Sequence, residues 1–397
     1  MIKRENYLSR IRGFYESDLV KILVGIRRCG KSVILNQIID ELKEKKCDDK
    51  HIIYINFEYI EYEELKDYRK LNKFIKEKLM DEKKYYIFLD EIQKVDKFED
   101  VVNSLRASTN NTSIFITGSN SKLLSQELSS VLSGRYVLFN IFPLSYKEFV
   151  ELSKKNPKDD TTFWNYVKWG GLPNRCQFDN ENNIKDYLHS VFDSIILRDV
   201  VERLGLKDTI LFNLLLQYIV DTTGREFSAE NVISFLKSED KSISTDTLYT
   251  YLDALCKALI IRKIYRYDIH GKAVLKTLNK YYMTDLGIAQ IKNNDFEINK
   301  SFAIENIIYN ELLQRGYDVY IGKTKLGEID FIATKDKIKE YYQVTYLLAN
   351  DNVIEREFGA FKVIEDNYPK YVLSLDKTDF SQNGIIHKNI IEWLLEN

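Results

Sequence analysis

The chain has 397 residues, 44% of them hydrophobic and 30% charged, and its 58 basic and 60 acidic residues leave a formal charge of −2. This length and balance indicate two to four globular domains. They exclude a disordered chain and one whose overall charge would attract nucleic acid. The four cysteines form no Cys-x-x-Cys pair, which argues against a zinc site or a disulfide framework. No apolar stretch is long enough to span a bilayer, so we expect a cytoplasmic protein that does not enter the membrane.

The first informative motif is Gly-Ile-Arg-Arg-Cys-Gly-Lys-Ser at residues 25–32. It fits the Walker A pattern G-x-x-x-x-G-K-[ST] and stands between an apolar run at 20–24 and a helical pattern, which is the context that the pattern requires. Backbone N–H groups of such a loop bind phosphate oxygens. Lys31 would reach the β- and γ-phosphates and Ser32 would hold Mg²⁺. We expect ATP or GTP to be bound by Gly25, Arg28, Cys29, Gly30, Lys31, Ser32 and Val33.

Strands and helices alternate after this loop. A buried strand is expected at 51–57, a helix at 65–80, and a second strand in the run Tyr-Tyr-Ile-Phe-Leu-Asp-Glu at 85–91. Such a run is also typical of a strand that meets a polar turn, but after a phosphate-binding loop it indicates the Walker B pattern. Asp90 would then join the Mg²⁺ shell, and Glu91 would orient or deprotonate the attacking water.

Polar residues also follow the next predicted strand. The strand at 113–117 runs into Gly-Ser-Asn at 118–120, which suits a cap for a helix at 123–132. Arg135 precedes a strand at 137–141 and is a candidate arginine finger for its own site or a neighbour's, or a solvated loop residue. These elements predict an α/β fold with a doubly wound parallel sheet that binds nucleotide at its carboxyl edge.

These motifs resemble those of bacterial and archaeal AAA-type ATP-binding proteins with a conserved C-terminal domain of unknown function. The resemblance rests on the motifs above and extends nearly end to end through residues 142–149, 170–173, 197–203, 282–287 and 327–331. It implies Mg²⁺-dependent ATP binding and slow hydrolysis, in a protein related to signal-transduction ATPases that act as switches. It also implies that Ser119 or Asn120 senses the γ-phosphate, and that Gly171 and Pro173 lie against the adenine.

The middle of the chain predicts helices followed by a winged helix. After a loop at 156–160, helical patterns cover 162–169 and 183–203. Three further helices, at 210–220, 228–236 and 243–259, precede a strand pair at 260–267 and 273–284.

The last of these helices is the expected recognition helix, with Thr247, Tyr249 and Thr250 exposed for a major groove. Residues 257–280 hold seven basic side chains and one acidic, which suits phosphate contacts. Residues 208–285 nevertheless hold ten of each sign, and winged helices in multidomain ATPases also bind proteins. DNA and a protein therefore both remain candidate partners.

The final part of the chain is similar to restriction-endonuclease-like folds. Glu305 is expected on a helix, Asp330 on a strand, and Gln343-Val344-Thr345 on the next strand. Thr345 stands where a lysine would activate water, and Gln343 supplies an amide instead of a carboxylate. We expect an inactive nuclease-like fold kept for binding or packing, although Glu305 and Asp330 would still hold Mg²⁺ weakly.

Four parts are thus expected: an ATPase core at 1–155, a helical lid at 156–205, a winged helix at 206–290 and a nuclease-like domain at 291–397. The expected function is an ATP-driven switch that repositions its C-terminal modules on a protein or DNA partner. An ATP-gated, metal-dependent nuclease is the alternative, and a nucleotide-stabilised scaffold is a third hypothesis. Homo-oligomerisation is left open.

Overall fold

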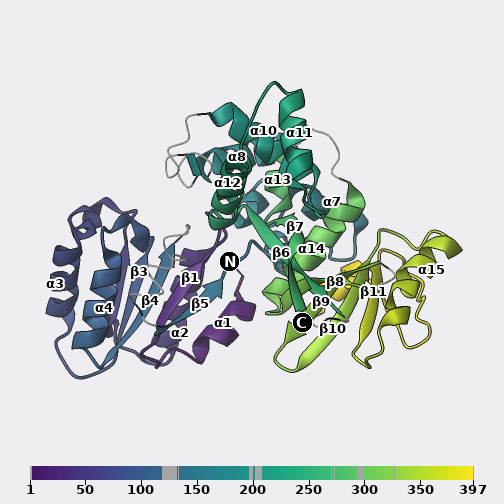
Figure 1. The fold of residues 1–397 in the computed structure, drawn as a ribbon. Coiled ribbons are helices and arrows are strands. Elements are labelled where there is room, and N and C mark those ends of the chain that lie inside the picture. Colours follow the sequence, from purple (N-terminus) through teal and green to yellow (C-terminus); the bar gives the residue numbers. More distant parts are fainter. Residues whose placement is uncertain are drawn as a thin grey trace. The chain divides into compact units, whose positions relative to one another are not determined.

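The structure is a computed structural model, and it describes residues 2–118, 132, 134–195, 200–201, 208–269, 271, 273–292, 299–324 and 327–396. The chain forms two compact units, residues 1–142 and 143–397 (Figure 1). The boundary between the units lies close to the expected end of the ATPase core. The finer division into four parts stays a prediction.

The first unit is built on a five-stranded sheet in the order β2-β3-β4-β1-β5. All four pairings are parallel, as the alternating strands and helices predict. The strands are β1 (Val20–Val24), β2 (Ile52–Asn56), β3 (Tyr85–Asp90), β4 (Thr112–Gly118) and β5 (Tyr136–Asn140). Every residue of β1, β3 and β4 is buried, because both faces of a parallel sheet are covered, and this explains their continuous apolar runs.

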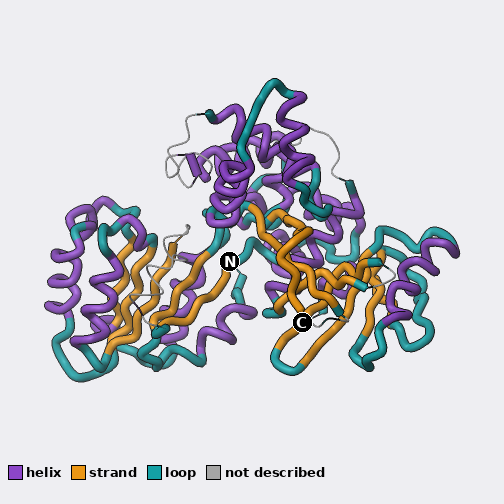
Figure 2. Tube along the Cα trace, viewed as in Figure 1, coloured by secondary structure: helices purple, strands orange, loops and turns teal. Residues whose placement is uncertain are grey.

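Helices flank this sheet (Figure 2). They are α1 (Glu5–Arg12), α2 (Lys31–Glu44), α3 (Tyr68–Lys78) and α4 (Phe98–Ser108). The helix expected at 65–80 begins later, at Tyr68, after a 3-10 helix at Ile60–Lys66. Asp67 sets this start because its side chain accepts the backbone N–H groups of Arg69 and Lys70 at 2.9 Å each, which caps the helix.

The second unit begins with helices. They are α6 (Tyr146–Ser153), α7 (Asp160–Trp169), α8 (Glu181–Ile195), α10 (Thr209–Asp221), α11 (Ala229–Ser238) and α12 (Thr245–Lys257). A further helix, α13 (Leu286–Lys292), follows the first two strands of the unit. The caps at Ser228 and Ser244 explain where α11 and α12 start. The helix expected at 183–203 begins earlier, at Glu181, and much of its second half lies outside the described residues.

A seven-stranded mixed sheet completes this unit, in the order β12-β11-β10-β9-β8-β6-β7. Its strands are β6 (Ile261–Asp268), β7 (Ala273–Met283), β8 (Asp318–Lys323), β9 (Glu328–Lys335), β10 (Ile338–Val344), β11 (Lys370–Ser374) and β12 (Ile386–Asn389). The helices α14 (Lys300–Gln314), α15 (Asp351–Gly359) and α16 (Ile390–Leu395) accompany it.

The strand pair expected as the wing is part of this larger sheet. β6 and β7 pair in antiparallel fashion as predicted, but β6 also pairs in parallel with β8. A free wing would show only the first pairing. The expected winged-helix and nuclease-like parts therefore share one continuous sheet.

Candidate nucleotide-binding site

The phosphate loop connects β1 to α2, and its backbone requires glycine at two positions. Gly30 has φ of 103°, in the left-handed region that favours glycine. A Cβ on Gly25 would lie 2.2 Å from the Ile141 carbonyl oxygen and 2.7 Å from Cys29 Sγ. No side chain caps the N-terminus of α2 at Gly30. The loop thus presents backbone N–H groups at the end of a 14-residue helix, which is an arrangement that binds anions.

Lys31 is the first residue of α2, directly after this loop. Its side chain is 4% exposed, and Nζ donates to the carbonyl oxygens of Gly25 and Ile26 at 3.1 and 3.3 Å. The same Nζ lies 3.9 Å from Glu91 Oε1. The structure therefore brings together Lys31 and the second carboxylate of the Walker B motif.

Asp90 is held by side chains from both neighbouring strands. It is fully buried at the end of β3, and its Oδ2 accepts hydrogen bonds from Tyr54 Oη at 3.0 Å and Asn56 Nδ2 at 3.1 Å. The hydroxyl of Thr117, on β4, donates to Oδ1. These bonds fix the orientation of the carboxylate, which is what a metal ligand needs.

Tyr54 and Asn56 belong to no motif noted in the sequence, and Thr117 is noted there only at the end of a strand. The register of the parallel sheet supplies the missing signal, because Asn56 pairs directly with Asp90. Polar residues at the carboxyl ends of strands next to a Walker B strand are therefore candidates for its partners. Burial, together with the charge of Asp90, raises the pKa of Tyr54, so this phenol stays a donor.

Glu91 has a strained backbone. Its φ of 56° and ψ of 44° lie in the left-handed region, which costs a residue with a side chain about 1–2 kcal/mol. Its N–H donates to Thr117 Oγ1 at 3.0 Å, and its Oε2 accepts from Gln93 Nε2. Strain that the surroundings maintain is typical of functional sites. The conformation turns Glu91 out of the strand direction just after Asp90.

The other predicted phosphate-site residues lie around the loop. Ser32 and Val33 are half-buried in the first turn of α2, and Arg28 is exposed with φ of 63°. Cys29 is fully buried, and its Sγ donates to the Ile141 carbonyl at 3.4 Å. Burial raises the pKa of this thiol. Cys29 therefore packs the loop against the residue that follows β5, and its backbone N–H donates to the Ile26 carbonyl oxygen at 3.3 Å.

Two further predictions concern the region before β5. Arg135 is exposed, and its backbone carbonyl accepts the N–H of Val20 at 3.1 Å, so its main chain belongs to the sheet edge. Ser119, Asn120 and the helix expected at 123–132, apart from Leu132, lie outside the described residues. The finger and sensor roles stay predictions.

Gly171 and Pro173 lie in the second unit, where Pro173 begins a 3-10 helix at Pro173–Gln177. The N–H of Gly171 donates to Asp285 Oδ2 at 2.7 Å, and the N–H of Gly287 donates to Oδ1 at 2.9 Å. A Cβ on Gly171 would lie 2.3 Å from the Leu144 carbonyl oxygen. The motifs at 170–173 and 282–287 therefore contact each other within this unit, which gives Gly171 a packing role. The adenine contact of Gly171 and Pro173 stays a prediction.

The carboxylates of the expected nuclease-like site are engaged by protein groups. Glu305 is 7% exposed, accepts the hydroxyl of Tyr282, and lies 3.4 Å from Lys280 Nζ. Lys280 also forms an ion pair with Glu328. Burial raises the pKa of Glu305, and the charge of Lys280 opposes this shift. Lys280 therefore supplies the positive charge that this carboxylate needs.

Asp330 and Gln343 bind each other's strands. Asp330 Oδ2 accepts the N–H of Val344 at 2.8 Å, and Gln343 Oε1 accepts the N–H of Asp330 at 2.8 Å. Gln343 Nε2 donates to Glu357 at 3.0 Å. Throughout the described parts of the chain, no group of three or more His, Cys, Asp or Glu side chains is arranged to hold a metal ion. The contacts of Glu305, Asp330 and Gln343 favour a packing role for these side chains.

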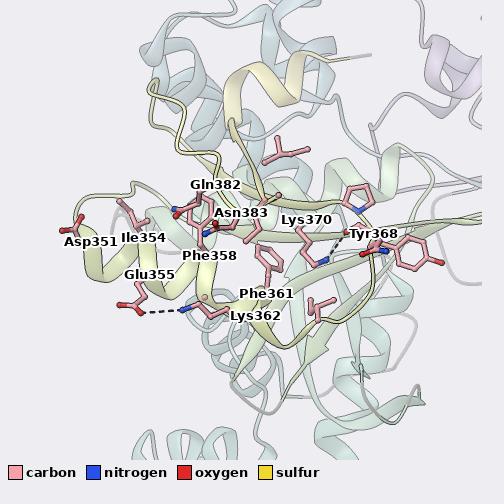
Figure 3. A pocket seen from close by; sticks show the side chains of 17 residues that line it. Asp351, Ile354, Glu355, Phe358, Phe361, Lys362, Tyr368, Lys370, Gln382 and Asn383 are labelled. Atoms are coloured by element: carbon pink, nitrogen blue, oxygen red, sulfur yellow. Dashed lines mark hydrogen bonds and ion pairs between the residues drawn. The ribbon is translucent and has the colours of Figure 1, made fainter.

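A cavity of about 750 Å³ lies in the second unit, beside α15 (Figure 3). Phe358 and Phe361 supply apolar surface, and Lys362, Tyr368 and Lys370 supply polar groups. Lys362 Nζ forms a 3.8 Å ion pair with Glu355. Of the residues that the structure describes, none that line this cavity belongs to a motif noted in the sequence.

Comparisons with known proteins agree with this geometry. Residues 17–150 match an AAA domain, and residues 160–296 match a domain of unknown function. A Walker-type ATPase of Pyrococcus abyssi has a similar fold, with a TM-score of 0.52 at 15% sequence identity over 74% of this chain and 96% of that one. The fold and the loop geometry are thus those of an AAA-type P-loop ATPase domain.

Two relatives match this chain over most of its length. An uncharacterised protein of Haemophilus influenzae is 37% identical over 100% of this chain and 99% of its own length. The uncharacterised protein MJ1544 of Methanocaldococcus jannaschii is 33% identical over 87% of this chain and 79% of its own length. The chain belongs to the family of these proteins. Within the described residues, no helix has the length and apolar character needed to cross a membrane.

Proposed function

We propose that this protein is a Mg²⁺-dependent ATPase that works as a switch, in which the nucleotide state repositions the second unit on a partner. The observation that supports it most directly is the approach of Lys31 Nζ to within 3.9 Å of Glu91 Oε1, beside a fully buried Asp90. The γ-phosphate of ATP would separate this pair, because it is a stronger partner for the lysine than a single carboxylate. ATP binding would then free Glu91 to act on water.

Each residue of the expected nucleotide site has a role in this proposal. Lys31 would contact the β- and γ-phosphates, Ser32 and Asp90 would hold Mg²⁺, and Glu91 would orient the attacking water. The backbone of the loop from Gly25 to Val33 would bind the phosphates. Ser119 as the sensor, Arg135 as the finger and Pro173 as the adenine contact complete the expected site.

Nucleotide binding is tested by Lys31→Ala. We expect it to abolish binding of Mg²⁺·ATP in equilibrium titrations, while Lys43→Ala leaves binding unchanged. Lys43 is a matched control because it lies on the same helix with an exposed side chain. Full ATP affinity in Lys31→Ala would rule out this loop as the nucleotide site.

The switch itself is tested by hydrogen exchange. ATP, and not ADP, should change exchange in peptides from residues 143–397, and Lys31→Ala should remove the difference. If exchange changes only within residues 1–142, the protein binds nucleotide without acting on its second unit, and the scaffold hypothesis is favoured.

We propose that a protein is the partner rather than DNA. Two of the basic residues in the stretch 257–280 are buried in ion pairs within the unit. Arg266 contacts Glu226 and Glu328 at 2.5 and 2.9 Å, and Lys280 contacts Glu305 and Glu328. Charges that are paired in this way contribute little to phosphate binding. Tight, salt-sensitive binding of duplex DNA by the purified chain would contradict this choice.

We also propose that the second unit does not cleave DNA, because Glu305 is paired with Lys280 and Asp330 is held by the backbone of the neighbouring strand. Supercoiled plasmid incubated with the protein, Mg²⁺ or Mn²⁺ and ATP should stay intact. Nicking that Asp330→Ala abolishes would instead support the ATP-gated nuclease.

A further inference from the structure

A buried arginine at the N-terminus connects the phosphate loop to the end of the first unit. Arg4 is the N-cap residue of α1 and is only 2% exposed. Its Nη1 donates to the carbonyl oxygen of Cys29 at 3.1 Å, and its Nη2 donates to the carbonyl oxygen of Phe142 at 3.1 Å. Cys29 belongs to the phosphate loop, and Phe142 is the last residue of the first unit. One planar guanidinium thus joins two segments that are far apart in sequence.

The contact with Cys29 bears on phosphate binding. The peptide between Cys29 and Gly30 is planar and trans, so its C=O and its N–H point in opposite directions. The hydrogen bond from Arg4 to the Cys29 carbonyl therefore fixes the direction of the Gly30 N–H, one of the backbone donors of the loop. Arg4 Nη1 would also lie 3.3 Å from a Cβ placed on Gly30, which shows how closely the guanidinium lies beneath the loop.

Phe142 is held through both of its main-chain polar groups. Its carbonyl accepts from Arg4, and its N–H donates to Tyr7 Oη at 3.1 Å. Tyr7 is 1% exposed, and its ring lies 4.8 Å from the guanidinium carbon of Arg4. The preceding residue, Ile141, donates its N–H to the Val24 carbonyl at 2.6 Å and accepts the thiol of Cys29.

The arginine is itself anchored by its backbone. The N–H of Arg4 donates to Gln37 Oε1 at 3.1 Å, and Gln37 Nε2 donates to the Ile2 carbonyl at 2.6 Å. Gln37 lies on α2, the helix that the phosphate loop opens. The segment from Ile2 to Tyr7 is therefore tied to α2, the loop and Phe142, and α1, α2 and β5 lie together in the first unit (Figure 1).

We infer that Arg4 is a positioning residue for nucleotide, and that with Tyr7 it makes the N-terminal segment a strap between the phosphate loop and Phe142. When nucleotide binding moves the loop, the Cys29 carbonyl moves with it. The guanidinium of Arg4 transmits this movement to Phe142, the residue from which the chain enters the second unit. This inference rests on the proposed ATPase function. It adds a structural route by which a change of bound nucleotide is transmitted from the phosphate loop to Phe142, the last residue of the first unit.

The test compares Arg4→Ala, Arg4→Lys and Tyr7→Phe with Arg10→Ala in the full chain. Arg10 is a matched control because it is an exposed arginine on the same helix. Hydrogen exchange is measured without nucleotide, in peptides that contain Cys29–Gly30 and Ile141–Phe142. We expect Arg4→Ala to accelerate exchange in both peptides, Tyr7→Phe only in the second, and Arg10→Ala in neither. Equal exchange in Arg4→Ala and Arg10→Ala would overturn the inference, and so would an acceleration spread equally over β2 and β3.

Nucleotide binding gives the second readout. Arg4→Ala should weaken Mg²⁺·ATP binding about tenfold, since a buried charged hydrogen bond that orders the loop is lost. It should also remove any ATP-dependent protection of Ile141–Phe142. Arg4→Lys should restore the affinity only in part, because an ammonium cannot reproduce the planar fork that serves two carbonyls. If the wild type binds no ATP, the proposed function fails, and the nucleotide-free exchange still decides whether the strap exists.

Discussion

Thr117 and Asp90 lie on adjacent parallel strands, and the hydroxyl of Thr117 donates to the buried Asp90 carboxylate. The same hydroxyl oxygen accepts the N–H of Glu91 at 3.0 Å. One threonine therefore orients the expected Mg²⁺ ligand and stabilises the strained backbone of the residue that would act on water. Thr117 is thus the residue through which β4 positions Asp90 and Glu91.

Thr117→Val should disturb both functions of this hydroxyl. The change leaves Asp90 with one donor fewer and the Glu91 N–H without its acceptor, so we expect a loss of about 1–3 kcal/mol in the free energy of unfolding. Mg²⁺-dependent ATP affinity should fall as well, which isothermal titration would measure. Thr112→Val, at the other end of β4, is the control, because its hydroxyl bonds to Thr109 at 2.8 Å. Equal ATP affinities in the two variants would contradict the role of Thr117.

Glu91→Gln should separate nucleotide binding from turnover. The amide preserves the size of the side chain but cannot accept a proton, so we expect hydrolysis to fall by about 100-fold or more while Mg²⁺·ATP still binds. Phosphate release and equilibrium binding are measured on the same preparation. Glu82→Gln, which is exposed, should hydrolyse ATP at the wild-type rate. Wild-type turnover in Glu91→Gln would mean that another group acts on the water.

Gly25→Ala should damage the phosphate loop through sterics alone. The new methyl group would lie 2.2 Å from the Ile141 carbonyl oxygen, so the loop and the end of β5 must move apart. We expect a loss of about 1–3 kcal/mol in stability, together with weaker ATP binding. In Gly13→Ala the nearest atom outside the neighbouring residues lies 3.9 Å away, so this variant should melt like the wild type. Normal melting and binding in Gly25→Ala would show that the contact can relax.

Lys21 should give the protein a measurable pH dependence. This residue of β1 is fully buried, and Nζ donates to the Ser17 carbonyl at 3.0 Å and to Ser113 Oγ at 2.7 Å. Burial lowers its pKa to about 7, with the charge of Lys84 acting in the same direction. The unfolded chain therefore holds a proton that the folded chain lacks between this value and the ordinary pKa of 10.5.

The sign of the effect follows from this difference. Stability should fall as the pH is lowered from about 10 towards 7, by up to about 1.4 kcal/mol per pH unit, and this contribution should level off below about 7. Lys21→Met should remove the slope, which urea unfolding at several pH values would measure. A variant with the same slope as the wild type would show that Lys21 does not cause it.

The core of the ATPase domain could be predicted from sequence because its signals are local. A glycine-rich loop must stand between a strand and a helix, and the apolar runs of β1, β3 and β4 reflect burial on both sheet faces. Asp90, Glu91 and Lys31 are accordingly predicted from motifs. Tyr54, Asn56 and Thr117 are not predicted in this way, because their importance depends on which strands become neighbours. The sequence of a single strand does not show its place in the sheet.

The same limit applies to the second unit. The antiparallel pairing of β6 with β7 follows from their nearness in sequence and was confirmed. The parallel pairing of β6 with β8 joins residues 266–268 to 321–323, and no local pattern indicates it. Likewise, the glycines at 170 and 171 read as a turn until Asp285 is seen to bind the second of them.

The shared sheet of the second unit has a practical consequence for truncated proteins. A fragment that ends near residue 290, as the sequence alone would suggest, retains β6 but removes β8 from its side. Both the fragment and its complement would then expose a row of unpaired backbone groups, and such edges attract other strands and promote aggregation. Fragments of this region should therefore begin near Pro143 and keep every strand through β12.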